Sequence, residues 1–323
     1  MDDIFGGIVK RSRAHLARAI SIVEDEAVGA AGLLSLAYRH RKGAMITGIT
    51  GAPGVGKSTL VDAVVSQLRS RGRSVGIIAV DPSSPFTGGA ILGDRVRMRS
   101  AHNLDPDVFF RSLASRGQMG GVSRHTGDTI ALLDAFGFDD ILVETVGAGQ
   151  SEVDIMKYVH TVIVALAPGM GDDIQAIKAG ILEIGDVFCV NKADLPGADR
   201  TRREIEMMLG MKGGGTVGVA GSAEWRPPVI ETVATSAEQK GISELVDAVV
   251  SHREYLLASD LFRAKNLQSY RAVLEEYLRL LTVQKIMDAA QRDGSLDRIL
   301  DDLLSGTLGP MEAAARMVAG FVG

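Results

Sequence analysis

The residues best suited to chemistry form a glycine-rich stretch that reads Gly51-Ala52-Pro53-Gly54-Val55-Gly56-Lys57-Ser58. It matches the pattern G-x-x-x-x-G-K-[ST], in which backbone N–H groups and a helix N-terminus surround a phosphate. A strand-like apolar run precedes it at 45–50, and apolar residues at helical spacing follow it. Lys57 can reach the β- and γ-phosphates of a nucleotide, and the Ser58 hydroxyl can bind Mg²⁺. We therefore predict a nucleotide site made by Gly51, Ala52, Pro53, Gly54, Val55, Gly56, Lys57, Ser58 and Thr59.

A second motif indicates which base is bound. Asn191-Lys192-Ala193-Asp194 has the pattern N-K-x-D and follows the apolar run 187–190. The Asp194 carboxylate can accept hydrogen bonds from N1–H and from the 2-amino group of guanine, a donor pair that adenine lacks. Hydrogen bonds to a charged group contribute about 1.5–3 kcal/mol each, enough for strong selection of guanine. We expect Asn191 to tie neighbouring loops together and the Lys192 stem to lie against the base.

Two further loops fit the same kind of site. Ser236, Ala237 and Glu238 follow the strand-like run 229–234 and look like the last guanine-binding loop of GTPases. The run 140–147 stands where most GTPases have D-x-x-G, but its acid is Glu144. A carboxylate at a strand end suits Mg²⁺, and the Gly147 N–H suits a γ-phosphate contact. The alternative is a turn whose acid is simply solvated.

The sequence leaves open which residue orients the water that attacks GTP. Ala148 stands where Ras-like proteins place the water-positioning glutamine, and Gln150 is nearby but displaced. The candidate catalytic residues are Lys57, Glu144, Gly147 and Gln150. We expect slow intrinsic hydrolysis because that glutamine is missing from its usual place.

Composition limits the possible partners. The chain has 323 residues, is 46% hydrophobic and carries a formal net charge of −5, which argues against a nucleic acid or an anionic membrane as partner. Its single cysteine, Cys189, stands in an apolar run and is expected to be a core residue. No apolar run reaches the ~18 residues of a membrane span, and the N-terminus has no signal-peptide pattern. We therefore expect a cytoplasmic protein.

The order of the apolar patterns predicts the domain organisation. Residues 1–42 are expected to form a helical extension. Residues 43–257 alternate strands and helices, which predicts an α/β GTPase domain with a mainly parallel central sheet flanked by helices. The expected strands are 45–50, 75–80, 108–111, 140–144, 161–167, 186–190 and 229–234.

Residues 258–323 are expected to form a C-terminal helical arm. Apolar residues from Leu267 to Leu281 recur at spacings of three and four, which predicts a long amphipathic helix. Ser295 is expected to cap a second helix, and Pro310 to start a third. Such an arm has too little core to fold alone. We expect it to pair two subunits into a homodimer, the alternative being a cover for the GTPase domain of its own chain.

Together these stretches resemble the MeaB/ArgK family of P-loop GTPases. The resemblance covers nearly the whole chain and is carried by 51–59, 81–95, 111–117, 144–152, 168–175 and 191–195. It implies that the chain binds GTP, GDP and Mg²⁺, hydrolyses GTP slowly under partner stimulation, and forms a homodimer. Members of this family act as chaperones of adenosylcobalamin-dependent methylmalonyl-CoA mutase. They gate loading of its cofactor and protect it from inactivation.

The resemblance also assigns residues that the motifs alone do not. It places Asp81 and Asp94 beside Ser58 and Glu144 as residues that bind or sense Mg²⁺, although Asp81 could instead cap a turn and Asp94 could form a surface ion pair. It implies a mobile loop called switch III, with Asp172, Asp173, Gln175 and Lys178. Asp172 and Gln175 also have the spacing of a capping box, so this segment can equally be an ordinary helix start.

Three other functions are compatible with parts of this pattern. A GTP-dependent metallochaperone for nickel or cobalt also uses glutamate in the D-x-x-G position, but it usually carries a cysteine cluster or a histidine-rich tract. A P-loop kinase is disfavoured by the N-K-x-D motif and by the lack of a lid. A scaffold that binds GTP without hydrolysing it would differ from the leading hypothesis only in turnover.

Overall fold

The computed structural model describes residues 2–81, 105–114, 125–145, 157–169, 181–211, 224–235 and 239–322. Several predicted site residues lie outside these ranges: Asp94, Gly147, Gln150, Asp172, Asp173, Gln175, Lys178, Ser236, Ala237 and Glu238. Asp81 is described as the last residue of a strand.

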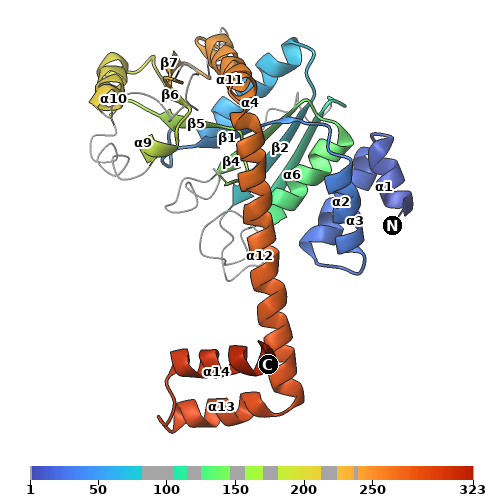
Figure 1. The fold of residues 1–323 in the computed structure, drawn as a ribbon. Helices are drawn as coiled ribbons and strands as arrows, with labels where there is room; N and C mark the ends of the chain where they lie inside the picture. Colours follow the sequence, from blue (N-terminus) through green and yellow to red (C-terminus); the bar gives the residue numbers. More distant parts are fainter. Residues whose placement is uncertain are drawn as a thin grey trace. The chain divides into compact units, whose positions relative to one another are not determined.

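A seven-stranded parallel sheet forms the centre of the first compact unit (Figure 1). Its strands are β1 (Met45–Thr50), β2 (Val75–Asp81), β3 (Val108–Ala114), β4 (Asp140–Thr145), β5 (Thr161–Leu166), β6 (Val187–Asn191) and β7 (Val229–Thr232). They lie side by side in the order β3-β2-β4-β1-β5-β6-β7. The predicted fold class is confirmed, and each predicted strand is present with bounds that differ by a few residues.

The central strands are made of residues that can be buried on both faces of the sheet. β1, β5 and β6 are buried along their whole length, as expected for parallel strands covered on both faces. Figure 1 shows helices on both faces of the sheet. Right-handed crossovers that run toward opposite edges of the sheet place their helices on opposite faces. The helix between β1 and β2 therefore faces away from the helix between β3 and β4.

The helices of the first unit form two layers. One layer holds α4 (Lys57–Ser70) and α11 (Ile242–Ala258), which contact each other. The other holds α6 (His125–Phe136), which contacts the N-terminal helices α1 (Asp2–Val9), α2 (Arg13–Glu24) and α3 (Ala30–Arg39). Among the described residues, α9 (Ile181–Ile184) and α10 (Ala198–Met211) are two further helices. The predicted helical character of residues 1–42 is confirmed.

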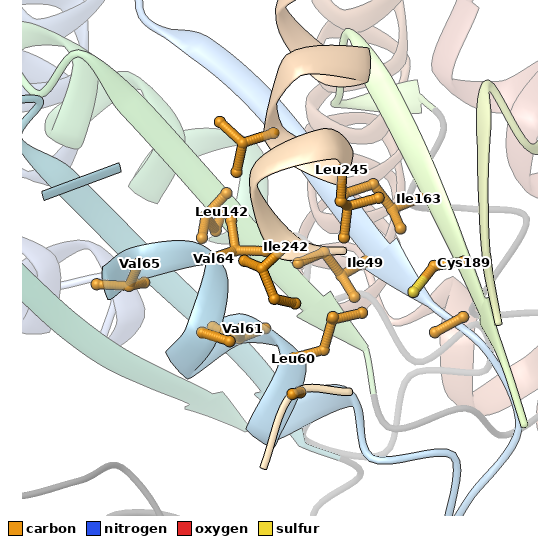
Figure 2. Packing of buried hydrophobic residues seen from close by; sticks show 14 of the residues in the cluster. Ile49, Leu60, Val61, Val64, Val65, Leu142, Ile163, Cys189, Ile242 and Leu245 are labelled. Carbon is orange, nitrogen blue, oxygen red and sulfur yellow. The ribbon is translucent and has the colours of Figure 1, made fainter. Parts of the chain in front are cut away.

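A hydrophobic core lies between the sheet and the α4–α11 layer (Figure 2). Leu60 and Val64 of α4 and Leu245 of α11 pack over Ile49 and Ile163 of the central strands. Burial of each such side chain contributes about 1.5–3 kcal/mol. This packing fixes α4, and so the loop before it, against β1.

The C-terminal helices are α12 (Leu261–Arg292), α13 (Ser295–Leu304) and α14 (Pro310–Val322). The chain divides into one compact unit that ends at Ser269 and a second that spans Tyr270–Gly323. The domain limits 42/43 and 257/258 remain predictions. Within the described ranges, no helix is long and apolar enough to cross a membrane.

The predicted capping role of Ser295 is wrong. The residue before α13 is Gly294, whose φ of 69° lies in the left-handed region, and Ser295 is the first helical residue. The side chain of Asp293 explains this start, because its Oδ1 accepts a hydrogen bond of 2.8 Å from the Ser295 N–H. The predicted start of a third helix at Pro310 is confirmed.

Candidate nucleotide-binding site

The predicted nucleotide-binding residues gather at the carboxyl edge of the sheet. β1 ends at Thr50, β4 at Thr145 and β6 at Asn191, and all three strands are parallel. Ligands of open parallel sheets bind outside this edge, where the chain turns to opposite sides. In this sheet the strand order changes direction at β1, which lies between β4 and β5.

The loop after β1 is shaped by two glycines. Gly51 has φ 143°, and a Cβ atom there would lie 2.1 Å from the Ala165 carbonyl oxygen. Gly56 has φ 90°, and a Cβ atom there would lie 2.8 Å from Asn191 Nδ2. Side chains are therefore excluded at both positions, so that the backbone can lie against β5 and β6.

Helix α4 begins at Lys57 without a side-chain cap. Its first N–H groups are the free donors of a helix N-terminus, which favours a bound anion. Lys57 is only 7% exposed, and its Nζ donates to the carbonyl oxygens of Gly51 at 2.6 Å and Ala52 at 3.0 Å. The ammonium group is thus held across the loop by the backbone. Pro53 and Gly54 form the exposed tip of the loop, and Thr59 is half-buried in the first turn of α4.

Ser58 and Glu144 lie far apart in the sequence but contact each other in the structure. The Ser58 hydroxyl donates to Glu144 Oε1 at 2.7 Å. Glu144 stands in β4 opposite Ile49 of β1, which is why its side chain lies close to the start of α4. Asp81 ends β2, the neighbouring strand, one residue beyond the partner of Thr145.

A hydroxyl and a carboxylate at this spacing fit Mg²⁺. Mg²⁺ is usually held by one or two carboxylates, with phosphate oxygens and waters completing its shell. The described residues contain no group of three or more His, Cys, Asp and Glu that could hold a metal ion by itself. The donor set therefore suits a cation that is bound together with a nucleotide.

Asn191 joins the phosphate loop to the loops after β6 and β7. It is 2% exposed, and its Nδ2 donates to the Val55 carbonyl oxygen at 2.9 Å. Its Oδ1 accepts from the Thr232 hydroxyl at 3.2 Å and from the Ala234 N–H at 3.4 Å. These bonds satisfy both ends of a buried amide, as burial requires. The expected tie between neighbouring loops is present.

The two charged residues of the same motif lie beside the phosphate loop. Lys192 has φ 57°, and its Nζ donates to the Gly54 carbonyl oxygen at 2.7 Å. Its stem therefore spans the space next to the loop, where a base plane is expected. Asp194 is exposed at the same edge, so its carboxylate is accessible to a ligand.

Sequence reasoning missed two hydroxyl contacts of this site. The Thr145 hydroxyl donates to the Thr50 hydroxyl at 3.1 Å and joins the ends of β4 and β1. Thr232, which holds Asn191, lies 3.1 Å from Cys189 Sγ. Because the Thr232 proton is directed to Asn191, the thiol is the donor of that contact. Burial raises the pKa of Cys189 to about 12, which keeps it a thiol, and its predicted place in the core is confirmed.

Comparison with known families agrees with this geometry. Residues 16–293 match the model of the family described as methylmalonyl Co-A mutase-associated GTPase MeaB. The chain belongs to the MeaB family. It is accordingly a P-loop GTPase that binds guanine nucleotides, as the sequence resemblance implied.

Individual MeaB relatives cover nearly the whole chain. A putative GTPase of Pyrococcus abyssi is 42% identical over 100% of this chain and 97% of its own length. GTPase ArgK of Escherichia coli is 32% identical over 96% of this chain and 93% of its own length. The mouse mitochondrial methylmalonic aciduria type A homolog is 31% identical over 99% of this chain and 79% of its own length.

A solved structure supports the fold. The crystal structure of an LAO/AO transport system kinase has a TM-score of 0.70 to this chain, with 99% of this chain and 97% of that chain covered. The two sequences are 24% identical, so this likeness shows the fold alone.

Proposed function

We propose that the chain is a GTP-hydrolysing chaperone that gates cofactor loading of adenosylcobalamin-dependent methylmalonyl-CoA mutase and protects the enzyme. The observation that supports the GTPase part is the hydrogen bond from Asn191 to Val55, because it joins the N-K-x-D segment to the glycine-rich loop after β1. The mutase part is supported by the match to a family described as mutase-associated.

Each described residue of the site has a role in binding GTP. Lys57 meets the β- and γ-phosphates, and the N–H groups at the start of α4 meet their oxygens. Asp194 accepts hydrogen bonds from the guanine edge, and the Lys192 stem covers the base. The phosphate and base parts of the site are held in register by Asn191, so binding one end of GTP positions the other.

Ser58 and Glu144 are the described residues that would hold Mg²⁺, with Asp81 and Asp94 as the further acids that the family resemblance implies. When bound, Mg²⁺ neutralises the charge that develops on the β- and γ-phosphates. The hydrogen bond between Ser58 and Glu144 holds both oxygen ligands close together without the ion. Little rearrangement is then required of these two side chains when the ion arrives.

We propose slow intrinsic hydrolysis. Gly147 is expected to contact the γ-phosphate through its N–H, and Gln150 is the candidate for orienting water. Neither stands at the position of the water-orienting glutamine of Ras-like proteins, which Ala148 occupies, so we expect a partner to accelerate the reaction. The 168–178 segment, with Asp172, Asp173, Gln175 and Lys178, is proposed as the element through which the mutase senses the nucleotide.

We also propose that the C-terminal helices pair two subunits. Leu267, Leu274 and Leu281 recur every seven residues on α12 and are 56%, 58% and 50% exposed. Residues seven apart lie on one face of a helix, so these leucines form an apolar stripe that a second copy of the helix can cover.

The proposal is tested by measuring GTP turnover with and without the mutase, together with GTP control of cofactor loading. Glu144→Gln should lower turnover strongly while GDP still binds, because the acid is expected to act on the metal and γ-phosphate. Glu254→Gln, on the exposed part of α11, is the matched control. Turnover that the mutase does not change would refute the chaperone role, whereas equal affinity for ATP and GTP would refute the guanine site.

No observation favours nickel or cobalt delivery. The only cysteine, Cys189, is fully buried and its thiol is used in a hydrogen bond within the core. It is therefore not available as a metal ligand.

A further inference from the structure

A cavity of about 60 Å³ lies near the amino edge of the sheet, opposite to the edge that carries the nucleotide motifs. Met45, the first residue of β1, and Asp140, the first residue of β4, both line it. Val64 of α4 and Leu245 of α11 form part of its wall. Figure 2 shows these two side chains where the helices meet over the central strands. Most of the lining residues are apolar, and the polar ones are Thr47, Arg73, Asp140 and Arg253.

The charged side chains of this cavity, two arginines and one aspartate, carry a net positive charge. Arg73 donates to both carboxylate oxygens of Asp140, from Nε at 2.5 Å and from a terminal nitrogen at 3.0 Å. The charge of Asp140 is thus matched by Arg73. Arg253 also lines the cavity. Its charge acts on Asp140 from beyond ion-pair distance, and it makes no hydrogen bond or ion pair with any residue in the described ranges.

Arg253 is one of the cavity-lining residues that reach solvent. It is half-buried on α11, and Val250, one turn before it, is 38% exposed. Val249 is half-buried and lines the same side. A molecule that enters here would meet a guanidinium group and then walls that are mostly apolar but also include Thr47 and the paired Arg73 and Asp140.

This combination recognises an amphipathic anion with a short tail. A guanidinium group pairs with a carboxylate through two parallel hydrogen bonds. An apolar cavity of ~150 Å³ holds benzene, so a cavity of 60 Å³ has room for about two to four carbon atoms. We propose that the cavity is a binding site for a short aliphatic monocarboxylate, with its hydrocarbon chain between α4 and α11 and its carboxylate on Arg253.

The proposed site is separate from the nucleotide site. Leu68, which lines the cavity, comes eleven residues after Lys57 in α4, about 16 Å along the helix. No residue of the phosphate loop or of the guanine motif lines the cavity. The experiment on this cavity is therefore independent of the proposed GTPase function.

Sodium butyrate is a suitable probe, with sodium chloride at the same ionic strength and neutral butyramide as comparisons. A ligand of about six heavy atoms is expected to bind with a millimolar dissociation constant. Titration followed by methyl NMR should give saturable shifts for the Val64, Leu142 and Leu245 methyl groups. Butyramide should bind about fivefold more weakly or worse, because it cannot form a charge-assisted pair.

Two variants test the geometry. Arg253→Gln should bind butyrate and butyramide equally, whereas Arg263→Gln, at an exposed position of α12, should keep the preference for butyrate. Val249→Phe should fill the cavity and abolish the shifts. Retained GDP binding would show that both variants are folded. The proposal is overturned if butyrate gives no more shift than chloride, or if butyrate binding is unchanged in both Arg253→Gln and Val249→Phe.

Discussion

Asn191 and Val55 are joined across the sheet by a 2.9 Å hydrogen bond from the side-chain amide of one to the carbonyl oxygen of the other. The bond connects the end of β6 to the loop after β1, and the same amide holds Thr232 and Ala234 through its oxygen. One buried side chain therefore positions three segments of the site.

Replacing this residue should affect both stability and binding. Asn191→Ala leaves the Val55 carbonyl and the Ala234 N–H without partners in a buried place, at a cost of about 1–3 kcal/mol each. We expect the free energy of unfolding to fall by about 2–4 kcal/mol and GTP affinity to fall with it. Denaturant unfolding and nucleotide titration measure the two effects. Normal GTP affinity in a destabilised variant would show that the tie does not position the site.

The carboxylate of Asp194 should determine the choice of base. Asp194→Asn is expected to weaken GTP binding and to favour xanthosine triphosphate, because an amide can donate to the oxygen that replaces the 2-amino group. Competition against a fluorescent GDP analogue measures both affinities. Asp199→Asn, exposed in α10, is a matched control and should change neither.

Two loop glycines should respond differently to alanine. At Gly51 the new Cβ would lie 2.1 Å from the Ala165 carbonyl oxygen, a backbone atom that cannot move away without disturbing β5. Gly54 also has a positive φ, of 84°, but nothing lies within 4 Å of its Cβ position. We expect Gly51→Ala to cost more than ~4 kcal/mol and Gly54→Ala about 1 kcal/mol. Thermal unfolding compares them, and equal losses would contradict the close approach at Gly51.

The apolar stripe of α12 should control the oligomeric state. Leu274→Glu together with Leu281→Glu places charges on the face that a second helix is proposed to cover. We expect a monomer by light scattering at concentrations where the unchanged chain is a dimer. Arg279→Glu, exposed on the same helix, serves as a control for added negative charge. A dimer that survives the double substitution would place the interface elsewhere.

The sequence predicts the sheet well because most strands contain a short run of apolar residues. Such runs need both faces covered, and the alternation with helical patterns leaves a parallel sheet as the consistent arrangement. The phosphate and guanine motifs are local, so Lys57 and Asn191 are found from spacing alone. The predicted start of α13 is wrong because Gly294 and Asp293 determine where the helix begins, and Ser295 does not cap it.

Contacts that depend on strand order are not visible in a single sequence. Thr50 and Thr145 meet only because β1 and β4 are neighbours although they are separated by β2 and β3 in the chain. The contact between Thr232 and Asn191 likewise depends on β6 and β7 being neighbours, and the cavity depends on α4 and α11 lying side by side. A threonine at the end of a strand is a weak signal, since threonine is common in strands for other reasons.

Two buried histidines should make stability depend on pH. Burial lowers the pKa of His160 to about 4, and it does the same for His252. His160 Nδ1 accepts from the Ile46 N–H at 3.1 Å, and its Nε2 faces Asn266 Oδ1 at 3.2 Å. His252 Nδ1 lies 2.8 Å from the Thr161 hydroxyl. Both rings are therefore neutral in the folded chain at pH 7.

The direction of the effect follows from proton binding. An unfolded histidine titrates near pH 6.5, so below this pH the unfolded chain binds protons that the folded chain does not. Stability is thus fully present above pH 6.5 and is lost as the pH falls toward 4, through the folded pKa values. Each histidine contributes about 1 kcal/mol of this loss between pH 6.5 and 5.5.

Denaturant unfolding at several pH values should show the slope of the free energy of unfolding against pH. His160→Gln and His252→Gln should each reduce it, whereas His40→Gln, at an exposed position, should reduce it less. An unchanged slope in both buried-site variants would show that these histidines take up protons in the folded state as readily as in the unfolded one.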